Sequence, residues 1–249
     1  MDVTPTRVRF LGSGDAFGSG GRFQACIQVR SQDSTVLLDC GASSLIAMRR
    51  FGVEPNDIDA ILVSHLHGDH FGGIPFFILD GQFLSRRERP LLIAGPPGID
   101  ERVRQAQEAL FAGSSQTQQK YEMHFLEWHD RRKEGIGGIS VTPFEVVHAS
   151  GAPPFALRLE VDGKTIAYSG DTEWTHTLIE LARGADLFIC EANFYEKNVK
   201  FHLDYQTLMD HKDELRCKRL VLTHMNVEML ARLPSLDVEA AEDGTEIVL

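Results

Sequence analysis

The sequence predicts a mixed α/β (α+β) fold: a four-layer αββα sandwich of two sheets packed face to face, with helices outside. Short apolar runs with strand character alternate with amphipathic stretches along all 249 residues. The two halves of the chain contain strands and helices in similar proportion, which favours two sheets of similar size. No repeat, low-complexity segment or Pro/Ser linker marks a boundary, so residues 1–249 are expected to form a single domain.

The first half alternates strands and helices. Its strand-like runs are short, apolar and mostly bounded by Gly or Pro. These runs are 8–11, 25–29, 36–38, 60–64 and 91–94. Helical patterns are predicted at 43–51, 72–83 and 99–111.

The second half repeats this alternation and contains two predicted hairpins. Its predicted strands are 122–127, 139–147, 155–161, 165–169, 187–190 and 220–222, and its predicted helices are 174–183 and 205–215. Asp162-Gly163 joins two of these strands, and such a dipeptide strongly indicates a two-residue hairpin turn. A final hairpin over 238–249 is expected to turn at Asp243-Gly244.

Composition excludes several classes of function. With 25 basic and 36 acidic residues, the net charge of −11 disfavours a protein that binds a long polyanion. We expect Arg86, Arg87 and Arg89 to form a solvated face rather than a nucleic-acid site. No apolar run approaches the roughly 20 residues that span a bilayer, and residues 1–4 do not resemble the start of a secretion signal. A cytoplasmic protein without a membrane partner is therefore expected.

The cysteines do not indicate a disulfide framework or a thiolate metal site, because they are far apart and lack C-x-x-C spacing. They are Cys26, Cys40, Cys190 and Cys217. We expect them to be small buried residues.

The segment Ser64-His65-Leu66-His67-Gly68-Asp69-His70 carries the clearest chemical signal. Chance would produce its H-x-H-x-D-H pattern in about one of a thousand chains of this composition. On a loop between a strand and a helix, His65 and His67 can face one point, while Asp69 and His70 face a second point nearby. Imidazole and carboxylate ligands of this kind suit zinc, with manganese or iron as alternatives.

Further ligands are predicted at the ends of other strands. His148, Asp171 and His224 each follow an apolar run. Because an α/β sheet gathers its site at the carboxyl ends of its strands, we expect these three side chains to join the histidine motif.

These motifs resemble those of the metallo-β-lactamase-fold metallohydrolase superfamily, and within it the ribonuclease Z-like branch. The resemblance covers 10–14, 38–41, 64–73, 169–172 and 222–224. It implies two divalent metal ions, with zinc expected. The implied ligands are His65, His67 and His148 for one ion, Asp69, His70 and His224 for the other, and Asp171 as a bridge.

The resemblance also implies roles beyond metal binding. Asp39 resembles an aspartate that orients site residues, with a simple turn residue before Gly41 as the alternative. Glu191 and His202 match a pair that protonates the leaving group, with a structural ion pair as the alternative. Asp69 is expected to accept a proton from the nucleophile, a hydroxide shared by the two metals.

Two departures from the branch bear on the substrate. Only 22 residues separate His148 from Asp171, so the long arm that ribonucleases of this branch use for transfer RNA is missing. In the early glycine-rich loop, 12–21, the polar residues typical of the branch are mostly replaced, although contact between this loop and a substrate phosphate stays open. A phosphodiesterase that acts on a small molecule or a short anionic ester is predicted, rather than an enzyme for long nucleic acids.

Other functions remain alternatives. A carboxyl-ester, lactone or thioester hydrolase would use the same metals, as would a true transfer-RNA 3′-processing endoribonuclease. A metal-dependent sensor or binding protein is the alternative from a different class. By analogy with the family, the chain is expected to form a homodimer.

Overall fold

The computed structural model describes residues 5–249, and the segment 1–4 considered for a secretion signal lies outside this range. Two seven-stranded sheets form the centre of the molecule. The first sheet contains β1 (Arg7–Gly12), β2 (Cys26–Arg30), β3 (Thr35–Leu38), β4 (Ala60–Leu62), β5 (Leu91–Gly95), β6 (Met123–Glu127) and β14 (Glu246–Val248). The second contains β7 (Glu134–Ile136), β8 (Ile139–Glu145), β9 (Phe155–Val161), β10 (Lys164–Tyr168), β11 (Leu187–Glu191), β12 (Leu220–Thr223) and β13 (Glu239–Ala240).

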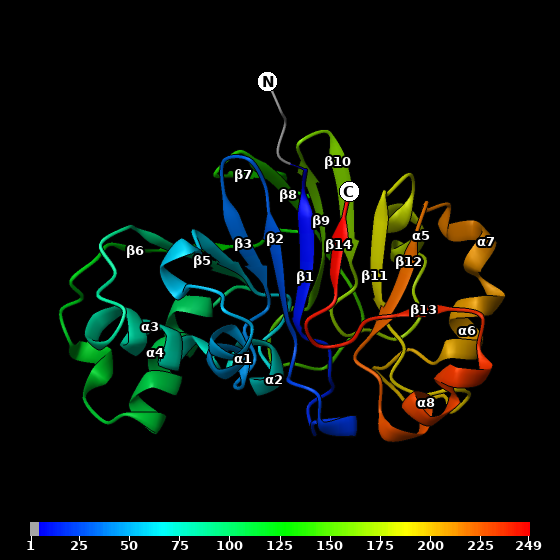
Figure 1. The fold of residues 1–249 in the computed structure, drawn as a ribbon, viewed down its shortest axis with the longest axis horizontal. Helices are drawn as coiled ribbons and strands as arrows, with labels where there is room; N and C mark the ends of the chain where they lie inside the picture. Colours follow the sequence, from blue (N-terminus) through cyan, green and yellow to red (C-terminus); the bar gives the residue numbers. More distant parts are fainter. Residues whose placement is uncertain (1–4) are drawn as a thin grey trace.

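Helices cover the outer faces of both sheets (Figure 1). Beside the first sheet lie α1 (Ser44–Arg50), α2 (Gly68–Phe71), α3 (Ile74–Phe83) and α4 (Ile99–Leu110). Beside the second lie α5 (Thr177–Ala182), α6 (Tyr205–Asp210), α7 (Lys212–Leu215) and α8 (Val227–Arg232). Short 3₁₀ turns are η1 (Ser19–Gly21), η2 (Pro55–Asp57), η3 (Ser114–Gln116) and η4 (Leu233–Ser235). The four-layer αββα arrangement predicted from the sequence is confirmed.

The central strands are apolar on both faces because each sheet is buried on both faces. In β3, Leu38 belongs to the core between the sheets, whereas Leu37 belongs to the core under the helices. In β11, Ile189 faces the partner sheet and Phe188 faces the outer helices. Because successive side chains of a strand point to opposite faces of the sheet, one continuous apolar run contributes residues to both cores.

Strand direction places the candidate residues at one end of the sandwich. In the first sheet, β3, β4 and β5 are parallel, and in the second, β10, β11 and β12 are parallel. Asp39 directly follows β3, Glu191 is the last residue of β11, and His224 directly follows β12. Parallel strands bring their carboxyl ends to a common edge, so the residues that follow them meet there.

The predicted C-terminal hairpin is wrong. Its two arms enter different sheets: β13 pairs with β12 in the second sheet, and β14 pairs with β1 in the first. The chain does turn near Gly244, whose φ is 90°. However, the Asp243 carboxylate accepts hydrogen bonds from the backbone N–H and hydroxyl of Ser13, both at 2.9 Å, and from the N–H of Phe23 at 2.7 Å. These contacts hold the turn against the early loop.

Smaller corrections concern element bounds. The strand predicted at 122–127 forms the edge of the first sheet rather than opening the second. The helix predicted at 205–215 is divided at His211 into α6 and α7. The short strand β7 was not predicted, because three residues carry too little periodicity.

The prediction of a solvated arginine face is wrong for Arg87. Its side chain is buried, and its guanidinium donates to the carbonyl oxygens of Ile58 and Pro90, each at 2.7 Å. Arg86 and Arg89 are exposed as predicted. The cysteines carry free thiols, and three of them are buried while Cys217 is half-buried. Within residues 5–249, no helix combines the length and apolar character needed to cross a bilayer.

Candidate metal centre

The structure brings the seven predicted metal-binding residues into two adjoining clusters. Within each cluster, the potential ligand atoms lie within 4.8 Å of one another. The first cluster is His65, His67 and His148, and the second is Asp69, His70, Asp171 and His224. These are the two groups expected from the sequence, and Asp171 lies between them.

Glycines allow the histidine motif to pack against the turn after β3. The Cys40 N–H donates to the His70 carbonyl at 2.6 Å, and the Gly73 N–H donates to the Cys40 carbonyl at 2.8 Å. A Cβ atom on Gly41 would lie 2.2 Å from the Asp69 carbonyl oxygen. Any larger residue would therefore separate Asp39 from His70 of α2.

Hydrogen bonds hold the imidazoles with one nitrogen directed into the clusters. His70 Nδ1 donates to Asp39 Oδ2 at 2.7 Å, and His148 Nδ1 donates to the Phe201 carbonyl at 2.7 Å. His65 Nδ1 donates to the Ser64 hydroxyl at 3.1 Å. In each case Nε2 remains free to bind a metal, as is typical of histidine ligands with an outer hydrogen-bond partner.

Asp39 accepts from donors on three sides. Besides His70, these are the Ser64 N–H at 2.7 Å, the Ser64 hydroxyl at 2.8 Å and the Tyr168 hydroxyl at 2.7 Å. Asp39 is fully buried and has a φ of 60°, which is uncommon outside glycine. Asp39 thus connects the two sheets and orients His70.

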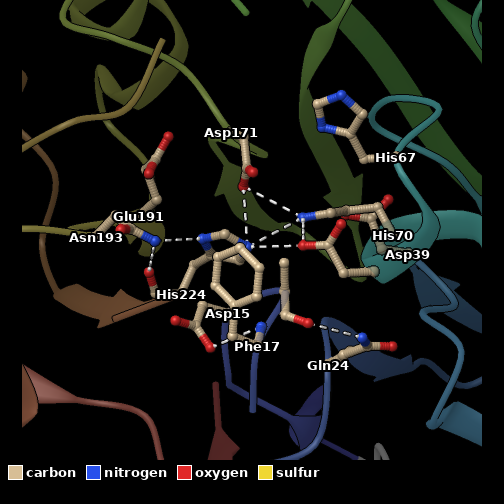
Figure 2. A network of polar contacts seen from close by, with 12 residues as sticks. Asp15, Phe17, Gln24, Asp39, His67, His70, Asp171, Glu191, Asn193 and His224 are labelled. Atoms are coloured by element: carbon tan, nitrogen blue, oxygen red, sulfur yellow. Dashed lines mark hydrogen bonds and ion pairs between the residues drawn. The ribbon is translucent and has the colours of Figure 1, made fainter. Parts of the chain in front are cut away.

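The two carboxylate oxygens of Asp171 face different clusters. Oδ1 lies 3.3 Å from His70 Nε2 and 3.6 Å from His224 Nε2 (Figure 2). Oδ2 lies 3.8 Å from His65 Nε2 and 3.9 Å from His148 Nε2. This is the arrangement that a bridging carboxylate requires.

The side-chain atoms of the two clusters are suited to bind metal cations. Among the described residues, His65 Nε2 and Asp171 Oδ1 are buried without a hydrogen-bond partner, which is costly unless something binds them. His67 Nδ1 lies 3.0 Å from His148 Nε2, and His70 Nε2 lies 3.3 Å from His224 Nε2. Converging imidazole nitrogens and carboxylates are the ligands of divalent transition metals, so the clusters fit a two-metal site.

Burial and neighbouring charges shift the pKa values of these groups. Burial lowers the pKa of His65 well below its usual value, which favours the neutral imidazole that a metal needs. Burial also opposes the charged form of His70, but Asp171, Asp69 and Asp39 outweigh it and raise its pKa. These three carboxylates therefore favour a protonated His70, and a bound metal would have to displace that proton.

Glu191 and His202 lie beside Asp171. His202 Nδ1 is 3.1 Å from Glu191 Oε2 and 3.9 Å from Asp171 Oδ2. Glu191 is fully buried, and its other carboxylate oxygen accepts from the Thr172 N–H. Burial lowers the pKa of His202, but the Glu191 carboxylate outweighs burial and raises it to about 9. His202 is therefore a protonated side chain, about a quarter exposed, at the edge of the clusters.

Sequence analysis missed two contacts that hold these residues. The Asn193 side-chain nitrogen donates to the His224 carbonyl at 3.0 Å and lies 3.2 Å from His224 Nδ1 (Figure 2). Phe201 contacts His148 through its carbonyl and has a φ of 74°. Asn193 lies in none of the predicted motifs, and no local signal identifies a backbone carbonyl as a histidine partner.

A comparison with protein families matches residues 6–236 to the family described as Anti-Pycsar protein Apyc1. The chain belongs to the Apyc1 family. This Apyc1-family chain is 26% identical over 272 residues to Ribonuclease Z of Methanosarcina acetivorans, covering 88% of this chain and 87% of that protein. It is 30% identical over 200 residues to the uncharacterized protein Rv1339 of Mycobacterium tuberculosis, covering 77% of this chain and 69% of that protein.

Solved structures share the fold of this Apyc1-family chain. The metallo-β-lactamase fold protein YhfI from Bacillus subtilis superposes with a TM-score of 0.77 at 20% identity, covering 98% of this chain and 100% of that one. The short form of human tRNase Z superposes with a TM-score of 0.77 at 24% identity, covering 97% and 98%. The resemblance inferred from the sequence is confirmed, and this Apyc1-family member is a metal-dependent hydrolase of metallo-β-lactamase fold.

Proposed function

We propose that the chain is a two-metal phosphodiesterase that acts on small molecules or short anionic esters. The observation that carries this proposal is the position of Asp171, with one oxygen toward each cluster and the His202–Glu191 pair 3.9 Å away. Two metal sites with an adjacent proton donor match the needs of phosphodiester hydrolysis, in which a water attacks and an alkoxide leaves.

Each of the two clusters is proposed to bind one metal ion. His65, His67 and His148 would hold one ion, Asp69, His70 and His224 the other, and Asp171 both. Zinc is the proposed metal, since imidazole with few carboxylates suits it. Two bound ions would lower the pKa of a water between them and polarise the phosphoryl oxygen.

Asp69 is proposed as the proton acceptor. Its Oδ2 lies 3.2 Å from His224 Nε2 and 3.3 Å from His70 Nε2, so it is held at the edge of the second cluster. Burial raises the pKa of Asp69, but His70 and His224 outweigh burial and lower it, keeping the carboxylate ionised. An ionised carboxylate there can accept the proton of an attacking water.

His202 is proposed as the proton donor. Glu191 binds its Nδ1 and keeps the imidazole protonated, which leaves Nε2–H free to donate to the departing alkoxide. Glu191 is buried, so its charge acts on His202 with little screening by water.

A small substrate is proposed because the chain offers little to hold a long RNA. Residues between His148 and Asp171 form the β9–β10 hairpin, in which β9 pairs with β10 from Lys164↔Val161 to Tyr168↔Leu157. This hairpin belongs to the second sheet, where the ribonucleases of the branch have a protruding arm. A net charge of −11 adds repulsion toward a polyanion.

The test is hydrolysis by zinc- or manganese-loaded protein of bis-p-nitrophenyl phosphate, cyclic nucleotides, precursor transfer RNA, a lactone and a thioester, with metal-loaded H67A as the control. Turnover of small phosphodiesters that H67A loses would support the proposal. Turnover of the lactone or thioester alone would establish the carboxyl-ester alternative. No turnover of any substrate by protein with two bound metals would favour a sensor or binding protein.

We propose that two copies of the chain associate through α3 and α4. Exposed apolar side chains on or next to these helices are Phe76, Phe83, Leu84 and Leu110. These side chains leave apolar surface in water on a single copy, which supports a contact between copies. Sedimentation should give a dimer for the wild type and a monomer for F83E. A monomeric wild type would contradict the proposal.

A further inference from the structure

Phe17 is the most exposed large apolar side chain among the described residues. It is 93% exposed, whereas Asp15, two residues earlier, is buried. Phe17 lies in the glycine-rich loop 12–21, whose part in substrate contact the sequence leaves open. A fully exposed phenyl ring gives up the free energy that its burial would contribute, so folding alone does not account for its position.

The loop that carries Phe17 is fixed by hydrogen bonds. Asp15 Oδ1 accepts from the Phe17 N–H at 3.2 Å and the Ser19 N–H at 2.9 Å, while Asp15 Oδ2 accepts from the Ser19 hydroxyl at 2.7 Å. From the other side, Gln24 Nε2 donates to the Ala16 carbonyl at 3.1 Å. The backbone on both sides of Phe17 is therefore held, although the ring itself makes few contacts.

The same loop is joined to the metal centre. The His224 N–H donates to the Ser13 carbonyl at 3.1 Å, and Gly14 forms a bridge with Met225. Three peptide units separate Gly14 from Phe17, so their Cα atoms are at most about 11 Å apart. In Figure 2 the ring of Phe17 extends from the loop toward the side on which His224 and Asp171 lie.

We propose that Phe17 is a specificity-determining residue: its ring stacks on a planar aromatic group that stays attached to the phosphate during hydrolysis at the metal centre, and not on the leaving group. This inference rests on the proposed phosphodiesterase function. An aromatic face held by its backbone loses little freedom when a flat group stacks on it. The substrate class is thereby narrowed to phosphate esters that carry an aromatic ring.

The first experiment uses two diesters with the same leaving group. Bis-p-nitrophenyl phosphate keeps an aryl group on the phosphate during hydrolysis, whereas methyl p-nitrophenyl phosphate keeps only a methyl group. F17A should raise the KM of the aryl diester about tenfold, the scale of one stacking contact, and leave its kcat and both constants of the methyl diester within about twofold. F17Y should retain the wild-type preference, and F17L should lose it. I46A, which removes an exposed apolar side chain from α1, is the matched control.

The second experiment does not require turnover, so it separates failure of this inference from failure of the proposed function. Calorimetry on metal-loaded protein compares phenyl phosphate with inorganic phosphate. Wild type should bind phenyl phosphate about tenfold more tightly, and F17A should bind both equally. Equal binding by the wild type, an unchanged preference in F17A, or retention of the preference in F17L would overturn the stacking role. A change of oligomeric state in F17A with unchanged preference would instead place Phe17 in a contact between copies.

Discussion

His70 Nδ1 donates a 2.7 Å hydrogen bond to Asp39 Oδ2, so a residue on the turn after β3 orients an imidazole of the second cluster. Asp39 also accepts from the Tyr168 hydroxyl on β10. One buried carboxylate therefore links the orientation of His70 to the packing of the two sheets. Changes at Asp39 should act on metal binding although Asp39 is not itself a proposed ligand.

Replacing Asp39 tests this link. D39N should weaken metal affinity about 10- to 100-fold, the usual effect of losing a carboxylate partner of a histidine ligand. Chelator competition on the purified protein measures this affinity directly. Y168F removes one of the donors to Asp39 and should have a much smaller effect. Unchanged metal affinity in D39N, with the fold intact, would show that His70 does not need the carboxylate.

Metal content tests the division into two clusters. Protein reconstituted with zinc or manganese should hold about two ions per chain, and H67A about one, because His67 belongs only to the first cluster. Bound metal should also raise the melting temperature in proportion to the logarithm of its concentration. Elemental analysis that finds one ion or fewer in wild type would rule out the two-metal proposal.

A comparison of esters with different leaving groups tests the role of His202. H202A should slow esters with a poor alkoxide leaving group by roughly 10² or more, the scale of one general acid. Esters of nitrophenol, whose leaving group needs little protonation, should be affected much less. Metal content should stay near that of wild type. An equal loss for both esters, or a loss of metal, would make His202 a structural residue or a ligand.

The pH dependence tests the role of Glu191. Because Glu191 raises the pKa of His202 to about 9, kcat for an alkoxide-leaving ester should fall as pH rises through about 9, where His202 loses its proton. Removing the carboxylate charge in E191Q should lower that pKa and move the fall to lower pH. The nitrophenyl ester provides the control, because its kcat should fall much less as the pH rises through this range. Identical profiles for wild type and E191Q would contradict the assignment.

Precursor transfer RNA tests the substrate size. Its kcat/KM should be well below that of a small activated phosphodiester at near-physiological salt, because the segment between His148 and Asp171 forms the β9–β10 hairpin of the sheet and leaves no long arm to hold RNA. Salt must be controlled, since low salt inflates binding to any polyanion. Efficient cleavage at the 3′ end of the RNA would identify the chain as a true processing ribonuclease.

Sequence patterns predicted the layers and the candidate ligands, because these depend on short-range features, whereas the division of the ligands into two groups was implied by the family resemblance. The apolar runs fix which segments are strands, and each candidate ligand follows such a run within two residues or lies in the histidine motif. The order of strands within each sheet was not predicted, since it depends on pairings between distant segments. The C-terminal residues show this limit: Asp243-Gly244 has the composition of a hairpin turn, but contacts with Ser13 and Phe23 decide its path.

The burial of individual side chains and their hydrogen-bond partners could not be predicted from the sequence either. Arg87 looks like its exposed neighbours, yet backbone carbonyls of Ile58 and Pro90 enclose it. His148 was predicted from its place after a strand, but its partner is a carbonyl 53 residues away. Such contacts use atoms that every residue has, so no residue type indicates them.

β1 pairs with β14, although Arg7 and its partner Val248 are far apart in the sequence, and β13 forms one edge of the other sheet beside β12. During synthesis, the first sheet therefore lacks one edge until β14 has left the ribosome. A nascent chain that stalls before β13 would expose unpaired backbone on β1 and β12 together, and both are ready templates for aggregation. Completion of both sheets thus waits for β13 and β14, and truncations that remove these two strands should lower the yield of folded protein.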